Sequence, residues 1–329
     1  MARIYGQSGC TDLLIQGVRK RGLTDLNSLN NITFFRNHFS DLMREAIEHA
    51  KEALTAEIRS LKNRIEQFVA EMKENIGNRE SMLLAEKEQI RELVNSSPNI
   101  KMPKRLKILE NKFEKELKKP FKKNKKTVDK MINQCEKMEL NYDTAIKKRT
   151  KKKIKQMNSS KQFLEKKAGF IPGAIGEERV VRELMELPDS FVIFNDVRLN
   201  LGKSIRWKKY NEYVKSCQID HVVIGPSGIF LIETKNWNPA TLHQTSFSPH
   251  KQVDRAGYIF FIKFIKLFKK LGKKISIRSI VVFTREWPDL NYPQVKQLIP
   301  RELVPYILYF PRELMDDEID LAAQWLVRA

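Results

Sequence analysis

The sequence contains little cysteine, no long apolar run and no glycine-rich phosphate loop. Its three cysteines, Cys10, Cys135 and Cys217, match no metal-ligand spacing, which argues against a disulfide framework or zinc finger and favours a reducing compartment. The most apolar helical stretch, residues 258–268, contains two lysines and is too short to span a bilayer. The first residues lack the apolar core of a signal peptide. We therefore expect a soluble, cytoplasmic protein that does not span a membrane and does not itself use ATP to drive motion.

Positive charge is abundant and unevenly distributed. The 329 residues carry a net charge of +21, and residues 101–170 hold 24 Lys and Arg against 8 Asp and Glu. Such a block favours a polyanionic partner, either nucleic acid or an acidic membrane surface. The lysines of residues 118–130 and 147–155 come in blocks without a strong apolar face, which disfavours the membrane. We expect nucleic acid to be the partner; a solvated helical face that only keeps the protein soluble is the alternative.

The first half of the chain is predicted to be largely helical. Residues 1–36 show no clear period and are expected to form a short lead-in. Residues 37–94 follow a heptad seam through Leu54, Ile58, Leu61, Ile65, Phe68 and Met72. A second helical segment covers about 104–167, with a kink or break expected at Pro120. Residues 37–167 are thus predicted to form a basic, antiparallel coiled-coil hairpin. An intermolecular coil, joining a homo-oligomer or a protein partner, is the alternative.

Residues 168–329 are predicted to form an α/β domain after a linker marked by glycine and proline. The expected elements are a helix from near Gly176, a strand at 191–197, a strand hairpin, a helix at 252–271, a strand at 280–283 and a closing helix near Asp316. This order suits a mixed sheet flanked by helices.

The hairpin is the most informative feature. Two apolar runs flank the turn-forming sequence Gly225-Pro-Ser-Gly228. A turn centred there pairs residues whose numbers sum to 453 and places Asp220 opposite Glu233. Directly opposed like charges are destabilising, so this juxtaposition predicts a cation between them. Side chains alternate along a strand, which puts Lys235 on the face of Glu233 and His221 on the face opposite Asp220. A surface ion-pair cluster, in which Lys235 neutralises both acids without a metal, is the alternative.

Two facing carboxylates beside an ammonium suit the hydrolysis of a phosphodiester bond. A divalent ion provides charge neutralisation and an activated water. Mg²⁺ prefers oxygen ligands and usually takes one or two protein carboxylates, a number that Asp220 and Glu233 supply. Lys235 would orient the water and oppose the negative charge of the transition state. The spacing therefore predicts a Mg²⁺ or Mn²⁺ site.

The same residues carry a family resemblance. Asp220 followed by Glu233-Thr-Lys235 resembles the D…ExK signature of the restriction-endonuclease-like PD-(D/E)xK nucleases, although no proline precedes Asp220. Together with Gly173-Ala-Ile-Gly-Glu177 upstream, the sequence is similar to the nuclease-related domain, NERD, over roughly residues 168–290. The resemblance implies a restriction-endonuclease-like fold for this α/β domain.

The resemblance also implies roles for further residues. It makes the Thr234 carbonyl a third metal ligand and Glu177 a third acidic group directed at the metal. Glu177 capping the start of its own helix is the alternative. Gln252, in Ser248-Pro-His-Lys-Gln252, matches a family element in which asparagine stands where this chain has Ser248.

Two functions follow from these features. The first is a metal-dependent nuclease, with DNA favoured over RNA as substrate and endonucleolytic cleavage expected. The second is a catalytically inactive nucleic-acid-binding or scaffold protein that keeps the nuclease-like fold. The presence of Asp220, Glu233 and Lys235 together favours the first, because an inactive domain has no chemical reason to keep a repulsive carboxylate pair.

Overall fold

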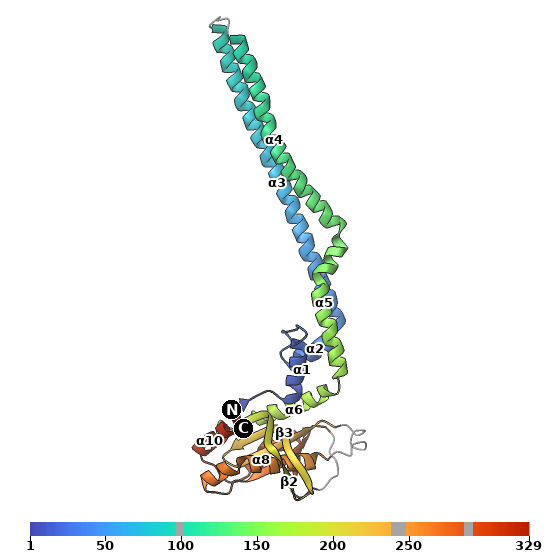
Figure 1. Ribbon diagram of the computed structural model, residues 1–329, viewed down its shortest axis with the longest axis vertical. Coiled ribbons are helices and arrows are strands. Elements are labelled where there is room, and N and C mark those ends of the chain that lie inside the picture. The colour runs from blue at the N-terminus through green and yellow to red at the C-terminus, as the bar shows by residue number, and fades with distance from the viewer. Residues whose placement is uncertain (97–101, 238–247, 286–291, 329) are drawn as a thin grey trace. The chain divides into compact units, whose positions relative to one another are not determined.

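The computed structural model describes residues 1–96, 102–237, 248–285 and 292–328 (Figure 1). The chain divides into two compact units, Met1–Phe39 with Gln156–Ala329, and Ser40–Lys155. The helical unit is made from α3 (Phe39–Ser96), α4 (Met102–Leu140) and α5 (Tyr142–Lys166), and the unit boundaries fall inside α3 and α5. Figure 1 shows α3 and α4 running beside each other in opposite directions.

Part of the predicted heptad seam is buried inside this helical unit. Leu54 and Ile58 of α3 pack in one cluster with Cys135 of α4. Lys62 and Glu139, with Nζ and Oε1 2.8 Å apart, form an ion pair between the same two helices. This stretch of the seam is therefore covered by the returning chain. That these helices form a coiled coil stays a prediction.

The second helical segment is interrupted at a different place from the one expected. The helix α4 continues through Pro120, and the interruption falls at Asn141. The Asn141 side-chain amide donates to the Lys137 carbonyl at 2.9 Å, and the Asn141 backbone N–H donates to the same oxygen at 3.1 Å. Asparagine ends helices in this way because its side chain competes for backbone partners.

The other unit is built on a mixed sheet, as predicted. Its six strands lie in chain order: β1 (Arg3–Tyr5), β2 (Val192–Trp207), β3 (Glu212–Gly225), β4 (Gly228–Lys235), β5 (Ile277–Phe283) and β6 (Lys296–Leu298). The strands β1 and β6 are not among those expected from the sequence. The pairs β2–β3 and β3–β4 are antiparallel, whereas β1–β2, β4–β5 and β5–β6 are parallel.

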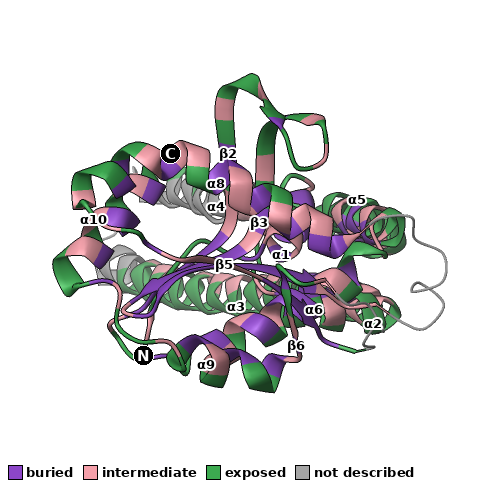
Figure 2. Ribbon diagram, turned by 90° about the horizontal axis from the view of Figure 1, so that it is seen from below, coloured by how far each residue is buried: buried purple, intermediate pink, exposed green. Residues whose placement is uncertain are grey.

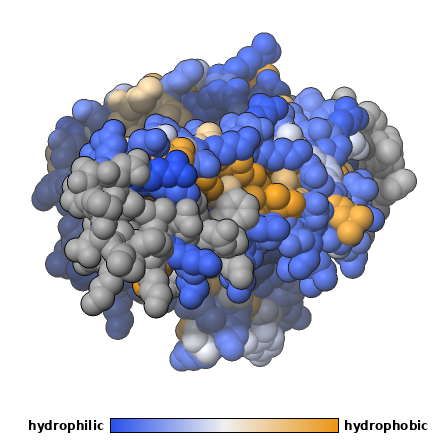
Figure 3. Space-filling model, turned by 90° about the horizontal axis from the view of Figure 1, so that it is seen from above, coloured by the Kyte–Doolittle hydropathy of each residue, from blue (hydrophilic) through white to orange (hydrophobic). Residues whose placement is uncertain are grey.

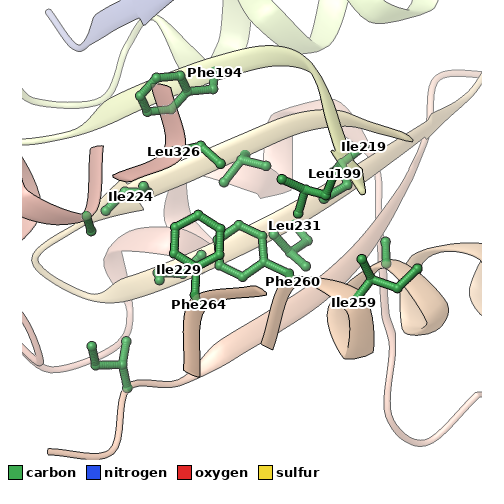
Figure 4. Packing of buried hydrophobic residues seen from close by; sticks show 14 of the residues in the cluster. Phe194, Leu199, Ile219, Ile224, Ile229, Leu231, Ile259, Phe260, Phe264 and Leu326 are labelled. Carbon is green, nitrogen blue, oxygen red and sulfur yellow. The ribbon is translucent and has the colours of Figure 1, made fainter. Parts of the chain in front are cut away.

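Helices cover both faces of the sheet, as Figure 2 shows. The helices α8 (Pro249–Leu271) and α10 (Asp316–Val327) pack on Ile229 and Leu231, with Phe260 and Phe264 filling the space between (Figure 4). The helices α6 (Phe170–Leu184) and α9 (Pro300–Leu308) pack on the opposite face, which carries Phe230 and other buried apolar residues. The continuous apolar run of β4 therefore reflects burial of both faces of this strand.

The first 39 residues contribute ordered elements to the same unit. The strand β1 pairs with β2, α1 (Gly9–Arg19) packs on α6, and α2 (Leu29–Asn37) follows. Leu14, Ile15 and Val18 are fully buried. The sequence shows no clear period here because a three-residue strand and two short helices repeat too few times.

The surface seen in Figure 3 is mostly hydrophilic, with hydrophobic residues gathered in small groups. Across the described ranges, none of the helices combines the length and apolar character needed to cross a bilayer.

Candidate functional site

The candidate site lies where β3 and β4 separate. The hairpin register predicted from the turn is confirmed from Gly225↔Gly228 to His221↔Ile232. Beyond that pair β4 continues only with β5, as far as Lys235↔Phe283. Asp220 and Glu233 are thus not ladder partners, which corrects the direct pairing expected from the sequence. The divergence opens a gap in the sheet, because β4 stays with its parallel neighbour instead of following β3.

Asp220 lies in β3 at the edge of this gap and contacts β4 across it. Its Oδ2 accepts a hydrogen bond from the Thr234 N–H at 2.7 Å. Desolvation of the carboxyl, followed by the negative charges of Glu233 and Glu177, raises the pKa of Asp220 well above its usual range. Three acidic side chains therefore repel one another across the gap, and the attraction of the Lys235 ammonium only partly offsets their effect on Asp220.

Glu233 and Lys235 form a nearly buried ion pair. The Glu233 side chain is 3% exposed and the Lys235 side chain 17%, and the Nζ and Oε1 atoms are 2.5 Å apart. Burial raises the pKa of Glu233, and the adjacent ammonium of Lys235 opposes that shift. The Lys235 Nζ also donates to Gln252 Oε1 at 3.2 Å. Lys235 is therefore held in one place by two acceptors.

Gln252 reaches the site because of where α8 begins. The Ser248 side chain accepts the Lys251 N–H at 3.2 Å, and Pro249 occupies the first helical turn. Serine at the N-cap followed by proline is a favoured helix start. The helix α8 consequently begins three residues before the expected position, with Gln252 close to its N-terminus.

Glu177 comes from the opposite layer of helices. The helix α6 begins at Phe170, earlier than expected, because a proline such as Pro172 is tolerated in a first turn. Glu177 therefore cannot cap its own helix. Its Oε2 instead accepts the N–H of Cys10, at 3.1 Å, in the first turn of α1. Unpaired N–H groups and the helix dipole stabilise a carboxylate at such a position.

A glycine permits this approach of α6 to the strand. A side chain at Gly176 would meet Cβ of Asn236 at 3.0 Å and Cγ2 of Thr234 at 3.4 Å. The absence of a side chain at Gly176 lets the helix lie against the end of β4. The neighbouring Glu177, which is 6% exposed, is thereby brought close to Asp220.

The N-terminal segment also borders the site, which no pattern in the sequence indicates. Burial first, and then the charge of Glu177, raises the pKa of the Cys10 thiol, and Asp220 and Lys235 also act on it. The thiol therefore lies within electrostatic reach of the site, but a raised pKa makes it a poor nucleophile. The Thr11 hydroxyl donates to Glu178 at 3.4 Å. These contacts join residues 167 positions apart, and no local pattern encodes such a contact.

The oxygen atoms around the gap suit a hard divalent cation. The Lys235 carbonyl accepts the Thr284 N–H on the β5 side at 3.0 Å. Backbone groups alternate in direction along a strand, so the backbone of Thr234 faces the side of Asp220. The carboxylates of Asp220 and Glu233, which act on each other electrostatically, and the carbonyl of Thr234 are the kinds of ligand that Mg²⁺ takes. Among the described residues, no cluster of three or more His, Cys, Asp or Glu could hold a metal ion. Glu177 therefore lies near the pair without completing a three-carboxylate cluster.

His221 lies on the other face of β3, as predicted. It is fully buried, and its Nδ1 is 2.7 Å from Asn195 Oδ1. Burial lowers the pKa of His221 to about 3. It is therefore a neutral core histidine. Burial likewise raises the pKa of Cys217 to about 12, which removes Cys217 from consideration as a nucleophile.

Comparison with known proteins identifies the domain that carries this site. Residues 172–284 match the family model of the nuclease-related domain, NERD. An uncharacterized protein of Bacillus anthracis is 38% identical over 66 residues, which are 20% of this chain and 26% of that protein. The chain thus spans about a quarter of the length of that relative. No solved structure matches the chain. All the site residues predicted from the sequence fall within the matched range. The match shows that the chain contains a nuclease-related domain at residues 172–284.

Proposed function

We propose that the nuclease-related domain is a metal-dependent endonuclease that hydrolyses phosphodiester bonds, with DNA as the substrate. The observation that carries this proposal is the gap between β3 and β4, where Asp220, Glu233 and Lys235 come together. The raised pKa of Asp220 supports it, because groups with strongly perturbed pKa values gather at functional sites. The mixed sheet with helices on both faces supports a restriction-endonuclease-like fold.

The carboxylates of Asp220 and Glu233 and the carbonyl of Thr234 would hold Mg²⁺ or Mn²⁺. When bound, such an ion supplies a Lewis acid for the phosphate and lowers the pKa of a bound water. Glu177 adds a further negative charge beside Asp220, which strengthens the attraction for a divalent cation. The Cys10 N–H keeps this carboxylate in place.

Lys235 has the role of stabilising the transition state. The contacts of its ammonium with Glu233 and Gln252 fix its position before substrate binds. A preorganised positive charge costs no reorganisation when negative charge develops on the phosphate. Gln252 is accordingly a positioning residue, which acts by orienting Lys235.

The basic helical unit would supply affinity for nucleic acid. Lysines and arginines that contact phosphates release counterions and bind without regard to sequence. Lys151, Lys152 and Lys153 are exposed on α5, so they are available for such contacts. Oligomerisation or binding of a protein partner through α3 and α4 is the alternative role for this unit.

One observation favours the competing function of an inactive binding or scaffold protein. The ion pair of Lys235 with Glu233 satisfies both groups without a metal. Asp220 supports the metal site, because the attraction of Lys235 for its carboxylate is outweighed by desolvation and by two negative neighbours. An ion-pair cluster gives no reason for burying the Asp220 carboxylate beside two other acids, whereas a metal site does.

The deciding experiment incubates the full chain with circular DNA, linear DNA, single-stranded DNA and RNA, in Mg²⁺, in Mn²⁺ or in excess chelator. The proposal expects DNA cleavage, including cleavage of the circle, only when metal is present. Cleavage that persists in chelator would overturn the metal site. Tight DNA binding without cleavage in either metal would establish the scaffold alternative.

A further inference from the structure

A groove of about 830 Å³ lies beside the candidate site, between the outer part of the β2–β3 hairpin and the first turns of α8. Arg198, Ser216 and Gln218 line it from the strands. Arg198 pairs directly with Gln218 across the β2–β3 ladder. These residues contribute hydrogen-bonding groups to the strand side of the groove, where Arg198 is ion-paired with Asp196 at 3.1 Å.

The opposite wall is one face of α8. Ser248, Lys251, Gln252 and Arg255 line the groove, and their spacing of three, one and three residues places them on the same side of a helix. Four residues rise about 6 Å along a helix, so Lys251 and Arg255 present positive charges one turn apart. The helix N-terminus at Ser248 adds the positive end of the helix dipole.

The groove carries a net positive charge. Its lining contains Arg198, Lys251, Arg255 and the carboxylate of Glu212. Lys251 is paired with Glu212 at 2.5 Å, and Arg198 is paired at 3.1 Å with Asp196, which lies beside the lining. The net excess of one positive charge is therefore that of Arg255. Arg255 is held by a hydrogen bond to the Ser216 carbonyl at 3.0 Å. Within the described ranges no carboxylate lies at ion-pair distance from Arg255, so its charge is free to meet an anion.

The groove is continuous with the candidate site. Gln252 lines the groove, and its Oε1 accepts the hydrogen bond from Lys235. Gln218 lies two residues before Asp220 and therefore on the same face of β3. A chain molecule lying in the groove would thus lead directly to the two acids and the lysine.

We infer that this groove binds one strand of the nucleic-acid substrate by its phosphodiester backbone, on one side of the bond to be cut, and that Arg255 positions it. The groove complements a nucleic-acid strand, which is extended and polar and carries negative charge at regular intervals. Basic grooves that follow the strand are a common way in which proteins bind single strands. The inference rests on the proposed function, but strand binding can be measured without cleavage.

A substitution at the helix N-cap gives a sharp test. Ser248→Asp keeps a good N-cap residue and places a carboxylate in the groove. Ser28→Asp is the matched control, because Ser28 is the N-cap of α2, where its Oγ accepts the Asn31 N–H at 3.2 Å, and it does not line the groove. A second pair compares Arg255→Gln with Lys266→Gln, an exposed position on the same helix.

Binding of a six-nucleotide single strand to the full chain is measured in chelator, where cleavage cannot interfere. Ser248→Asp and Arg255→Gln should each weaken binding at least about threefold, and both controls should match the parent. In parallel, a strand carrying a photoreactive thymine should cross-link to peptides covering 198–218 or 248–255. Equal affinity of groove variants and parent, or cross-links confined to residues 40–155, would overturn the inference.

The outcomes for the groove and for the enzyme can be told apart. If the groove variants weaken binding but the parent never cuts DNA in metal, the groove stands and the proposed activity falls. If the parent cuts and the groove variants bind and cut equally well, the activity stands and the groove falls.

Discussion

Replacement of Asp220 by asparagine should stabilise the metal-free protein. The amide oxygen can still accept the Thr234 N–H, a bond of 2.7 Å in the parent. The ion pair of Lys235 with Glu233 also stays in place. The change removes a desolvated charge that Glu233 and Glu177 repel. After the weaker, neutral hydrogen bond is subtracted, we expect a net gain on the order of 1–2 kcal/mol at neutral pH.

The gain should depend on pH in a defined direction. The native pKa of Asp220 is raised, so the folded carboxyl keeps its proton where the unfolded one has lost it. The stability that this group contributes to the parent is complete below the unfolded pKa of about 3.9 and is lost as pH rises through the native pKa. Asparagine cannot titrate. The advantage of Asp220→Asn should therefore be absent at about pH 4 and grow toward pH 8.

Thermal melts in chelator across this pH range measure the effect. A gain of this size corresponds to a rise in Tm of roughly 2–8 °C for a unit of this length. Asp189→Asn, at an exposed position, is the matched control and should melt like the parent. If Asp220→Asn melts below the parent at neutral pH, Asp220 takes part in a favourable ion-pair cluster and the reasoning for a metal site is refuted.

Three further predictions test other parts of the molecule. The first replaces four exposed lysines of α5 by glutamine, namely Lys151, Lys152, Lys153 and Lys155. DNA binding should weaken, and the slope of log affinity against log salt should fall by about 0.9 for each lost phosphate contact. An unchanged slope would assign the helical unit to protein binding. Deletion of residues 1–19 should lower the Tm of the sheet unit, because β1 pairs with β2 and α1 packs on α6; an unaltered melt would contradict that role. The third is that His221→Gln should lose less stability on acidification than the parent. The pKa of His221 is lowered to about 3 in the folded protein, so the parent loses stability as pH falls below about 6.5. Denaturant titrations that show equal acid sensitivity of the two proteins would contradict this.

The hairpin and its neighbours could be predicted because their signals are local. Alternation around Gly225-Pro-Ser-Gly228 fixes the register through His221. The same alternation places Glu233 and Lys235 together. The long heptad seam predicts α3, and strands alternating with amphipathic helices predict a mixed sheet flanked by helices.

The remaining features depend on contacts between distant residues. The separation of β4 from β3 follows from the pairing of β4 with β5, which lies some forty residues further along the chain. The contact of Glu177 with Cys10 in the first turn of α1 joins residues 167 positions apart, and the helices of the helical unit lie between them in the sequence. The groove requires α8 to lie beside the outer part of β3. A pattern read along the sequence reports periodicity and turn chemistry, but not which distant backbone groups meet.

The most direct test of the proposed metal-dependent nuclease activity is single-turnover cleavage of DNA by the parent and by Lys235→Gln, at protein concentrations that saturate the DNA. Glutamine can occupy the site of Lys235 beside Gln252 but carries no positive charge. We predict that the parent cuts in Mg²⁺ or Mn²⁺ and not in chelator, and that Lys235→Gln binds DNA within about twofold of the parent but cuts at least about a hundredfold more slowly. Equal cleavage rates for the two proteins, or cleavage by the parent in chelator, would contradict the account.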